Sequence, residues 1–285
     1  MDHHHHADDD PHDRGLAFDL TTLLRRRRLL GLLAGAGLVS LTACAAEPAA
    51  TADTGTAATS GQPASDTATG TTTDTGASCQ PIPEETEGPF PGDGSNGPNI
   101  LSQSGIVRSD LRPSFGSASG VAKGVPLTVR LTVLDTAKGC AGYAGAAVYL
   151  WQCDREGRYS MYDQALTREN YLRGVQAADA SGVVTFTTVY PGCYPGRWPH
   201  VHFEVYPNLA RATSAGGKIA TSQLAFPADI CRTVYATDGY SASVGNLARL
   251  SLATDMVFQD GYAQQLATVT GSVNSGYLAK LAVPV

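Results

Sequence analysis

Seven short runs of alternating or β-branched residues constrain the fold of this chain more than any other feature. In residues 126–134, Leu127, Val129, Leu131 and Val133 alternate with Thr and Arg. Because side chains alternate between the two faces of a strand, such a run predicts a strand with one buried face. The other six runs are residues 145–152, 183–189, 200–206, 218–226, 267–273 and 277–283. Short strands between glycine and proline turns predict an all-β fold, a sandwich of two packed antiparallel sheets.

The first 43 residues have the pattern of an export signal. Arg25 to Arg28 precede an apolar run over residues 29–43 that is too short to span a bilayer but has the size of a signal-peptide core. The arginines resemble both a twin-arginine signal and a basic general secretory signal. The run ends in Leu-Thr-Ala-Cys, which resembles a bacterial lipobox. We therefore expect an exported protein, either secreted or held at the outer face of the cytoplasmic membrane by a lipid on Cys44.

Residues 44–78 are predicted to form a flexible tether. After Cys44 the segment is mostly Ala, Thr, Ser, Gly, Pro and Asp, with no aromatic side chain, so it buries too little apolar surface to offset the entropy of ordering it. Residues 79–285 are long enough for one well-filled domain. Within that domain, residues 84–110 are expected to form an irregular cover, and residues 241–256 a short helix.

The charge of the chain argues against a nucleic-acid partner. The formal net charge is −6, and the five arginines and six aspartates before Cys44 contribute −1 of it, so −5 remains without them. A nucleic-acid-binding protein carries the opposite excess.

The cysteines fit an exported protein, in which disulfides persist. Five cysteines follow Cys44, so we expect one or two bridges and at least one unpaired thiol. Cys140 is the expected half of a bridge, with Cys79 or Cys153 as its partner. The other two cysteines are Cys193 and Cys231.

Residues 189–206 hold the first indication of chemistry. His200 and His202 lie two positions apart in a predicted strand, so both imidazoles should point to one face. The other five histidines, including the run His3 to His6, precede Cys44, which leaves this pair as the only histidines of the mature protein. Two imidazoles on one face make half of a metal site; the alternative is a pair of surface histidines on an edge strand.

Tyrosines near this strand could complete such a site. Tyr194 and Arg197 lie in the Pro-Gly loop before His200, and Tyr159 and Tyr162 lie in the polar turn after residues 145–152. Two phenolates with two neutral imidazoles suit Fe(III) better than Zn(II) or Cu(I), because hard ligands favour hard ions. Ionising a phenol at pH 7 means lowering its pKa from about 10, which a highly charged metal does readily. For each tyrosine alone, the alternative is an amphipathic residue at the edge of the core.

Several motifs, in order along the chain, resemble those of the intradiol ring-cleavage dioxygenases, and most of all their exported, single-domain bacterial members. They are Glu87-Gly88-Pro89-Phe90, Gly157-Arg158-Tyr159-Ser160, Tyr171-Leu172-Arg173-Gly174-Val175-Gln176, residues 182–192, Tyr194-Pro195-Gly196-Arg197 and His200-Val201-His202. The likeness begins at Cys79 and continues to Gly276-Tyr277, so it covers the whole predicted domain.

The resemblance implies two antiparallel sheets around a mononuclear non-haem Fe(III). The implied ligands are Tyr159, Tyr194, His200 and His202. Arg197 would lie over the substrate ring and stabilise negative charge on it. Gln223 resembles the family's active-site glutamine, although its separation from His202 is longer than in the family. Tyr194 would also act as the base that accepts a substrate proton.

The implied activity is that of an oxidoreductase that places both atoms of O₂ in a catechol-type substrate. The bond between the two hydroxyl-bearing carbons breaks, and a muconate-type dicarboxylic acid results. Two other interpretations suit the same residues: a non-catalytic, transthyretin-like β-sandwich binding module at the cell surface, and a Cu or Zn enzyme that uses the same histidines.

Two departures from the family stand out. Cys193 occupies a place where relatives often carry Trp, which predicts a wider or redox-sensitive pocket beside Tyr194. The helical N-terminal region of intracellular catechol 1,2-dioxygenases has no counterpart in this sequence. The dimerisation that depends on that region is therefore not expected, and the oligomeric state stays open.

Overall fold

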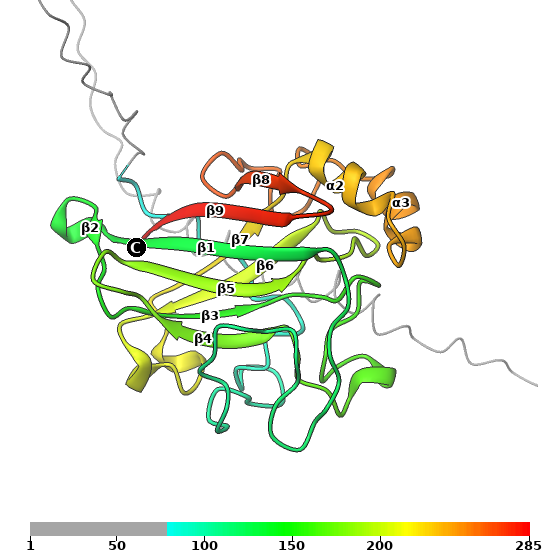
Figure 1. The fold of residues 1–285 in the computed structure, drawn as a ribbon. Helices are drawn as coiled ribbons and strands as arrows, with labels where there is room; N and C mark the ends of the chain where they lie inside the picture. The colour runs from blue at the N-terminus through cyan, green and yellow to red at the C-terminus, as the bar shows by residue number, and fades with distance from the viewer. Residues whose placement is uncertain (1–78) are drawn as a thin grey trace, which may run out of the picture.

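Two β-sheets lie face to face in residues 79–285, the part of the chain that the computed structural model describes (Figure 1). The predicted export signal and tether lie outside these residues. The seven predicted strands are all present, each within a few residues of its expected bounds. The predicted β-sandwich is therefore confirmed.

The first sheet has five strands in the described part of the chain. They are β1 (Pro126–Asp135), β2 (Ala141–Gly142), β5 (Val183–Val189), β8 (Thr268–Ser272) and β9 (Gly276–Pro284). The order is β2-β1-β9-β8, and β5 also pairs with β1. One expectation was wrong: β1 and β9 run parallel, from Leu127 opposite Tyr277 to Leu134 opposite Pro284. The long connection before β8 lets the C-terminal hairpin enter beside β1 in that direction, because a parallel pair needs a long crossover.

The second sheet has four strands and is antiparallel throughout. Its strands are β3 (Ala147–Trp151), β4 (Arg173–Ala177), β6 (His200–Tyr206) and β7 (Ala220–Ala225), in the order β4-β3-β6-β7. Strand β4 was not predicted, because its sequence, RGVQA, carries little apolar alternation. β6 is an inner strand of this sheet, with β3 and β7 on its two sides.

Alternate residues of both sheets fill the space between them. Val129 and Phe186 from the first sheet and Leu150, Phe203 and Leu224 from the second belong to one core cluster and are fully buried. Burying each such side chain contributes roughly 1.5–3 kcal/mol. The period-two pattern thus fixes which residues of β6 face the core, and leaves the others for the opposite face.

The remaining described segments cover the second sheet and one end of the molecule. As predicted, residues 84–110 have no regular strand or helix, although isolated bridges occur in them. Two helices pack together at one end, α2 (Ala228–Tyr235) and α3 (Ser241–Leu247) (Figure 1). The sequence predicted a helix in the α3 region and missed α2. Short 3₁₀ turns occupy Thr136–Lys138, Gln164–Leu166, Leu209–Arg211 and Ala215–Gly217.

A disulfide joins Cys79 to Cys140, 61 positions apart. Of the two partners expected for Cys140, the structure selects Cys79, which ties the first described residue to the turn after β1. Cys153, Cys193 and Cys231 are buried free thiols. No helix in residues 79–285 is long and apolar enough to cross a membrane.

Candidate metal centre

Strand β6 carries both histidines on the face of the second sheet that points away from the sandwich core. Their Nε2 atoms lie 3.0 Å apart. The neighbouring strands place Trp151 opposite His202 on one side and Gln223 opposite it on the other. Trp151 stacks on the His202 ring with centroids 4.8 Å apart and planes 6° apart. The predicted shared face is confirmed, but β6 is an inner strand and both rings are buried, so the alternative of surface histidines on an edge strand is wrong.

A backbone contact fixes the tautomer of His200. Its Nδ1 lies within hydrogen-bond distance of the Trp198 carbonyl oxygen, and since a carbonyl only accepts, Nδ1 carries the proton. The Nε2 atom therefore presents a lone pair toward His202 and Tyr194, which is the usual arrangement of a metal-ligating histidine.

Two tyrosines complete a ring of four side chains. The Tyr194 hydroxyl lies 3.2 Å from His200 Nε2. Tyr159 meets Tyr194 edge to face at 5.9 Å between centroids and lies 6.3 Å from the His202 ring. The turn after β3 brings Tyr159, and the loop after β5 brings Tyr194. The structure thus gathers all four predicted ligands, which are separated by up to 43 positions in the sequence.

Three of these groups, His200, His202 and Tyr159, are electrically neutral in the absence of a metal. Burial, and then the nearby Arg197 cation, lower the pKa of His200 to about 3. Burial, His200 and Arg197 hold the pKa of His202 well below its usual value. Burial and the adjacent Tyr194 raise the pKa of Tyr159 well above its usual value. Both imidazoles are therefore in the form that binds metals, whereas ionising the Tyr159 phenol needs a nearby cation.

The donor set fits a hard trivalent cation. The buried Tyr159 hydroxyl makes no hydrogen bond within residues 79–285, and a buried polar group without a partner is costly. Across the same residues, no cluster of three or more His, Cys, Asp or Glu side chains is arranged to hold a metal ion. A metal bound at this site would therefore depend on phenol oxygens, which favours Fe(III) over softer ions.

Arg197 lies beside the ring of four in a buried network. Its Nη2 donates to Gln223 Oε1 at 2.6 Å, and its Nε pairs with Asp255 Oδ2 at 3.2 Å. Gln223 Nε2 in turn donates to the Thr86 carbonyl oxygen at 2.9 Å. Both ends of the Gln223 amide are thus occupied, so this side chain orients Arg197 and ties it to the N-terminal cover.

Asp255 is a site residue that the sequence analysis missed. It is 1% exposed, and its carboxylate also accepts from the Trp198 backbone N–H at 2.6 Å. Burial opposes ionisation, but Arg197 and the Trp198 N–H outweigh it and hold the pKa of Asp255 below its usual value. Asp255 follows α3 in an irregular stretch with no motif around it. A lone aspartate in such a stretch gives no signal of its partner, which lies 58 positions away.

The structure contradicts the expectation of redox sensitivity at Cys193. The side chain is 2% exposed, and burial together with the Asp255 charge raises the pKa of this thiol to about 12. A buried, protonated thiol is unreactive. Two side chains of α3 hold its backbone. The Cys193 N–H donates to the Ser243 hydroxyl, and the Asn246 side-chain amide donates to the Cys193 carbonyl oxygen at 2.7 Å.

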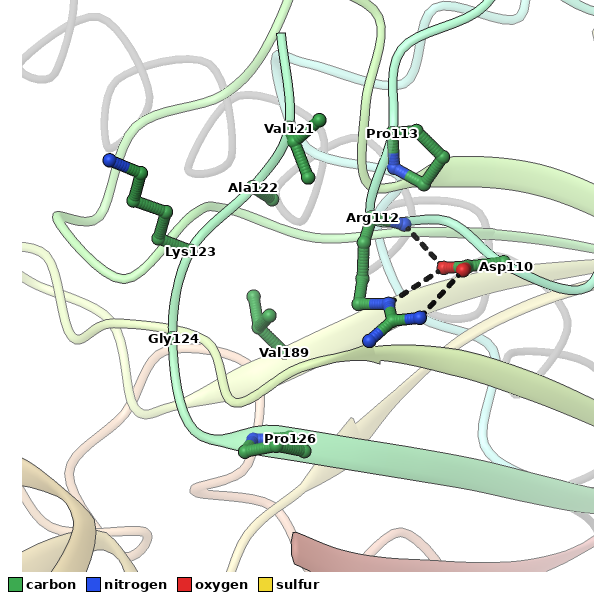
Figure 2. A pocket seen from close by; sticks show the side chains of 9 residues that line it. All are labelled: Asp110, Arg112, Pro113, Val121, Ala122, Lys123, Gly124, Pro126 and Val189. Atoms are coloured by element: carbon green, nitrogen blue, oxygen red, sulfur yellow. Dashed lines mark hydrogen bonds and ion pairs between the residues drawn. The ribbon is translucent and has the colours of Figure 1, made fainter.

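The candidate metal centre is separate from the open cavity drawn in Figure 2. That cavity, of about 460 Å³, lies on the surface between β1, the end of β5 and the cover. Its lining residues are Asp110, Arg112, Pro113, Val121, Ala122, Lys123, Gly124, Pro126 and Val189, and none of the predicted site residues is among them. At the candidate metal centre, Tyr194 is only partly buried and the next two residues are exposed.

Comparison with known proteins identifies the class of protein to which this sandwich, with its two histidines and two tyrosines, belongs. A protein-family model described as Dioxygenase matches residues 97–238, which contain every site residue predicted from the sequence. The chain belongs to the intradiol ring-cleavage dioxygenase family.

Solved structures are similar to this chain to different extents. An intradiol ring-cleavage dioxygenase from Tetranychus urticae is 24% identical, with a TM-score of 0.52 over 64% of this chain and 89% of that chain. The dioxygenase domain of a dioxygenase carbohydrate-binding protein fusion from Streptomyces sp. SirexAA-E is 25% identical, with a TM-score of 0.45 over 72% and 97% of the two chains. Catechol 1,2-dioxygenase from Pseudomonas arvilla C-1 is 20% identical, with a TM-score of 0.41 over 70% and 60%. No curated protein sequence matches the chain.

Proposed function

We propose that this protein is a non-haem Fe(III) dioxygenase that cleaves catechol-type rings between the two hydroxyl-bearing carbons. The observation that carries this proposal is the convergence of Tyr159, Tyr194, His200 and His202 from three segments. His200 Nε2 lies 3.2 Å from the Tyr194 hydroxyl and 3.0 Å from His202 Nε2, and its tautomer leaves that nitrogen free to bind.

The four side chains would hold the iron. When bound, Fe(III) would ionise the phenols, acidify the catechol hydroxyls and make the ring reactive toward O₂. Tyr194 is the partly exposed member of the set, so its oxygen is the one placed to accept a proton from an arriving catechol. Tyr159 is buried and would stay in place.

Arg197 would stabilise negative charge on the substrate. Its guanidinium is 3% exposed and shares the buried pocket with both histidines, whose pKa values it lowers. In such a water-poor site a fixed cation acts strongly on developing charge. Asp255 and Gln223 hold two sides of the guanidinium, which fixes the direction of the remaining N–H groups.

Iron content and colour test this proposal. The full chain, purified and loaded with Fe(III), should be red-brown from charge transfer between tyrosinate and iron, and should consume O₂ with at least one member of a panel of substituted catechols. Tyr194→Phe should lose most of the colour and the O₂ uptake. Tyr143→Phe, a change of the same kind beside β2, should leave both unaltered. A folded, colourless protein that binds no iron, or binds Cu or Zn in preference, would contradict the proposal.

We also propose that the enzyme acts outside the cytoplasm, as a lipoprotein anchored through Cys44 or as a secreted protein. The disulfide between Cys79 and Cys140 supports an oxidising compartment. A lipoprotein should incorporate labelled palmitate and lose the label in Cys44→Ala, whereas a secreted protein should appear in the medium without label. A cytoplasmic protein with both cysteines reduced would refute export.

A further inference from the structure

Arg173 is a fully buried cation without a carboxylate partner. It is 0% exposed and begins β4 opposite Trp151. Throughout residues 79–285 it contacts neutral acceptors only, and forms no ion pair. Burying an unpaired charge costs free energy, so the hydrogen bonds of this guanidinium must offset that cost.

The guanidinium joins the turn that holds Tyr159 to the N-terminal cover. Toward the Tyr159 turn, Nε donates to Ser160 Oγ at 3.2 Å and Nη2 donates to the Ser160 carbonyl oxygen at 3.0 Å. Toward the N-terminal cover, Nη1 donates to the carbonyl oxygens of Phe90 and Pro91 at 2.8 and 2.9 Å. We call residues 82–93 the strap, because this part of the cover crosses the second sheet.

The strap and the turn enclose the Tyr159 ring. Phe90 packs on Tyr159 with ring centroids 4.8 Å apart and on Tyr162 at 5.2 Å. The Gly92 N–H donates to the Tyr162 hydroxyl at 2.8 Å, and the Arg173 guanidinium lies over the Tyr162 ring at 5.3 Å. Because Ser160 follows Tyr159 directly, a shift of the Arg173 contacts would move the phenol oxygen and the Phe90 ring together.

We propose that Arg173 is a positioning residue that locks the strap to the Tyr159 turn and thereby sets where the Tyr159 oxygen stands. The use of Arg follows from geometry, because its planar fork reaches acceptors in three directions at once, whereas the Lys ammonium is a point donor. The part of this inference that concerns the metal rests on the proposed function. The part that concerns the two segments does not.

Replacement by Lys tests the inference, since it keeps the charge and removes the fork. In the iron-free full chain, Arg173→Lys should speed amide hydrogen exchange about tenfold in both residues 86–92 and residues 159–162, as expected for the loss of one or two hydrogen bonds. In the iron-loaded chain it should weaken iron retention about 10–100-fold, the usual effect of losing a partner that orients a ligand, and shift the tyrosinate-to-iron band.

Arg108→Lys is the matched control. Arg108 also directs its fork at backbone carbonyl oxygens, those of Pro113, Asn170 and Arg173, but it touches neither the strap nor the Tyr159 turn. It should lower the melting temperature without accelerating exchange in the strap or moving the band.

Each outcome decides a different point. Equal melting losses in the two variants, with unchanged exchange in the strap and the turn, would reduce Arg173 to a structural residue and overturn the inference. Accelerated exchange in one segment alone would also overturn it, because the lock requires both. If the wild-type chain binds no iron while Arg173→Lys loosens both segments, the proposed function fails and the lock between the segments stands.

Discussion

The two sheets differ in what lies on their outer faces. On the first sheet, Arg130, Thr185 and Lys280 point outward and are exposed, so its strands alternate between apolar and polar residues. On the second sheet, all seven residues of β6 are buried, although four of them, His200, His202, Glu204 and Tyr206, carry polar groups.

The cause of this difference is the cover. The first sheet, which is antiparallel except for the β1–β9 pair, leaves one face to water, as antiparallel sheets can. The strap and the turns before β4 and β6 close over the second sheet instead. The polar side chains of that sheet must therefore find partners inside the protein. Chemistry therefore concentrates where the fold buries polar groups, and stability concentrates in the apolar layer between the sheets.

Among changes to the covered face of the second sheet, removing a histidine should have the largest effect, which is the loss of iron. His202→Ala and the bulkier His202→Gln are both expected to lose iron completely, because each leaves only three of the four donors. Metal analysis and the visible spectrum check this result, and circular dichroism of the iron-free variants should still show the sheets. A His202 variant that keeps stoichiometric iron and cleaves rings would disprove the ligand assignment.

The adjacent position tests the opposite face of the same strand. Phe203→Ala should lower the free energy of unfolding by about 3–5 kcal/mol, the usual cost of a large cavity in a packed core. The iron content of the molecules that remain folded should equal that of the wild type. Denaturant titration and metal analysis measure the two quantities. Loss of iron without loss of stability would show that the two faces are not separable.

Breaking the buried ion pair between Asp255 and Arg197 should have an intermediate effect on both stability and catalysis. Asp255→Asn keeps the shape but removes the charge that offsets Arg197, so we expect a loss of about 1.5–3 kcal/mol in stability, as for hydrogen bonds to charged groups. The kcat for ring cleavage should fall as well, because Arg197 loses one of its two fixed contacts. A variant with wild-type kcat and lower stability would limit Asp255 to a structural role.

Breaking the exposed ion pair between Arg112 and Asp110 at the surface cavity should have the smallest effect on stability. Arg112 holds the pKa of Asp110 below its usual value, mainly through a side-chain hydrogen bond (Figure 2). Both side chains are 43% exposed. Such pairs contribute about 0–1 kcal/mol.

The sign of the pH dependence follows from the lowered pKa. The contribution of Asp110 is present above the usual aspartate pKa of about 3.9 and is lost as the pH falls through the lower, folded-state value. The difference in unfolding free energy between wild type and Asp110→Asn should therefore be small at pH 7 and vanish in acid. A difference that grows below pH 4 would contradict this assignment.

Local pattern predicted most of the strands and the shared face of His200 and His202, because period-two alternation is a property of consecutive residues. It failed for β4 and α2, whose sequences carry weak or ambiguous periodicity. It also failed for the parallel pairing of β1 with β9, since the direction of a strand depends on a connection elsewhere in the chain.

The candidate site divides in the same way. The motifs of the chain by themselves determined the four candidate ligands and Arg197, because those residues stand in short segments with recognisable spacing. Only the tertiary structure decided that Asp255 pairs with Arg197, that Gln223 is held by Thr86, and that Arg173 joins the strap to Tyr159. These contacts link residues 13 to 137 positions apart, and such partners become neighbours only when the sheets pack and the cover closes over them.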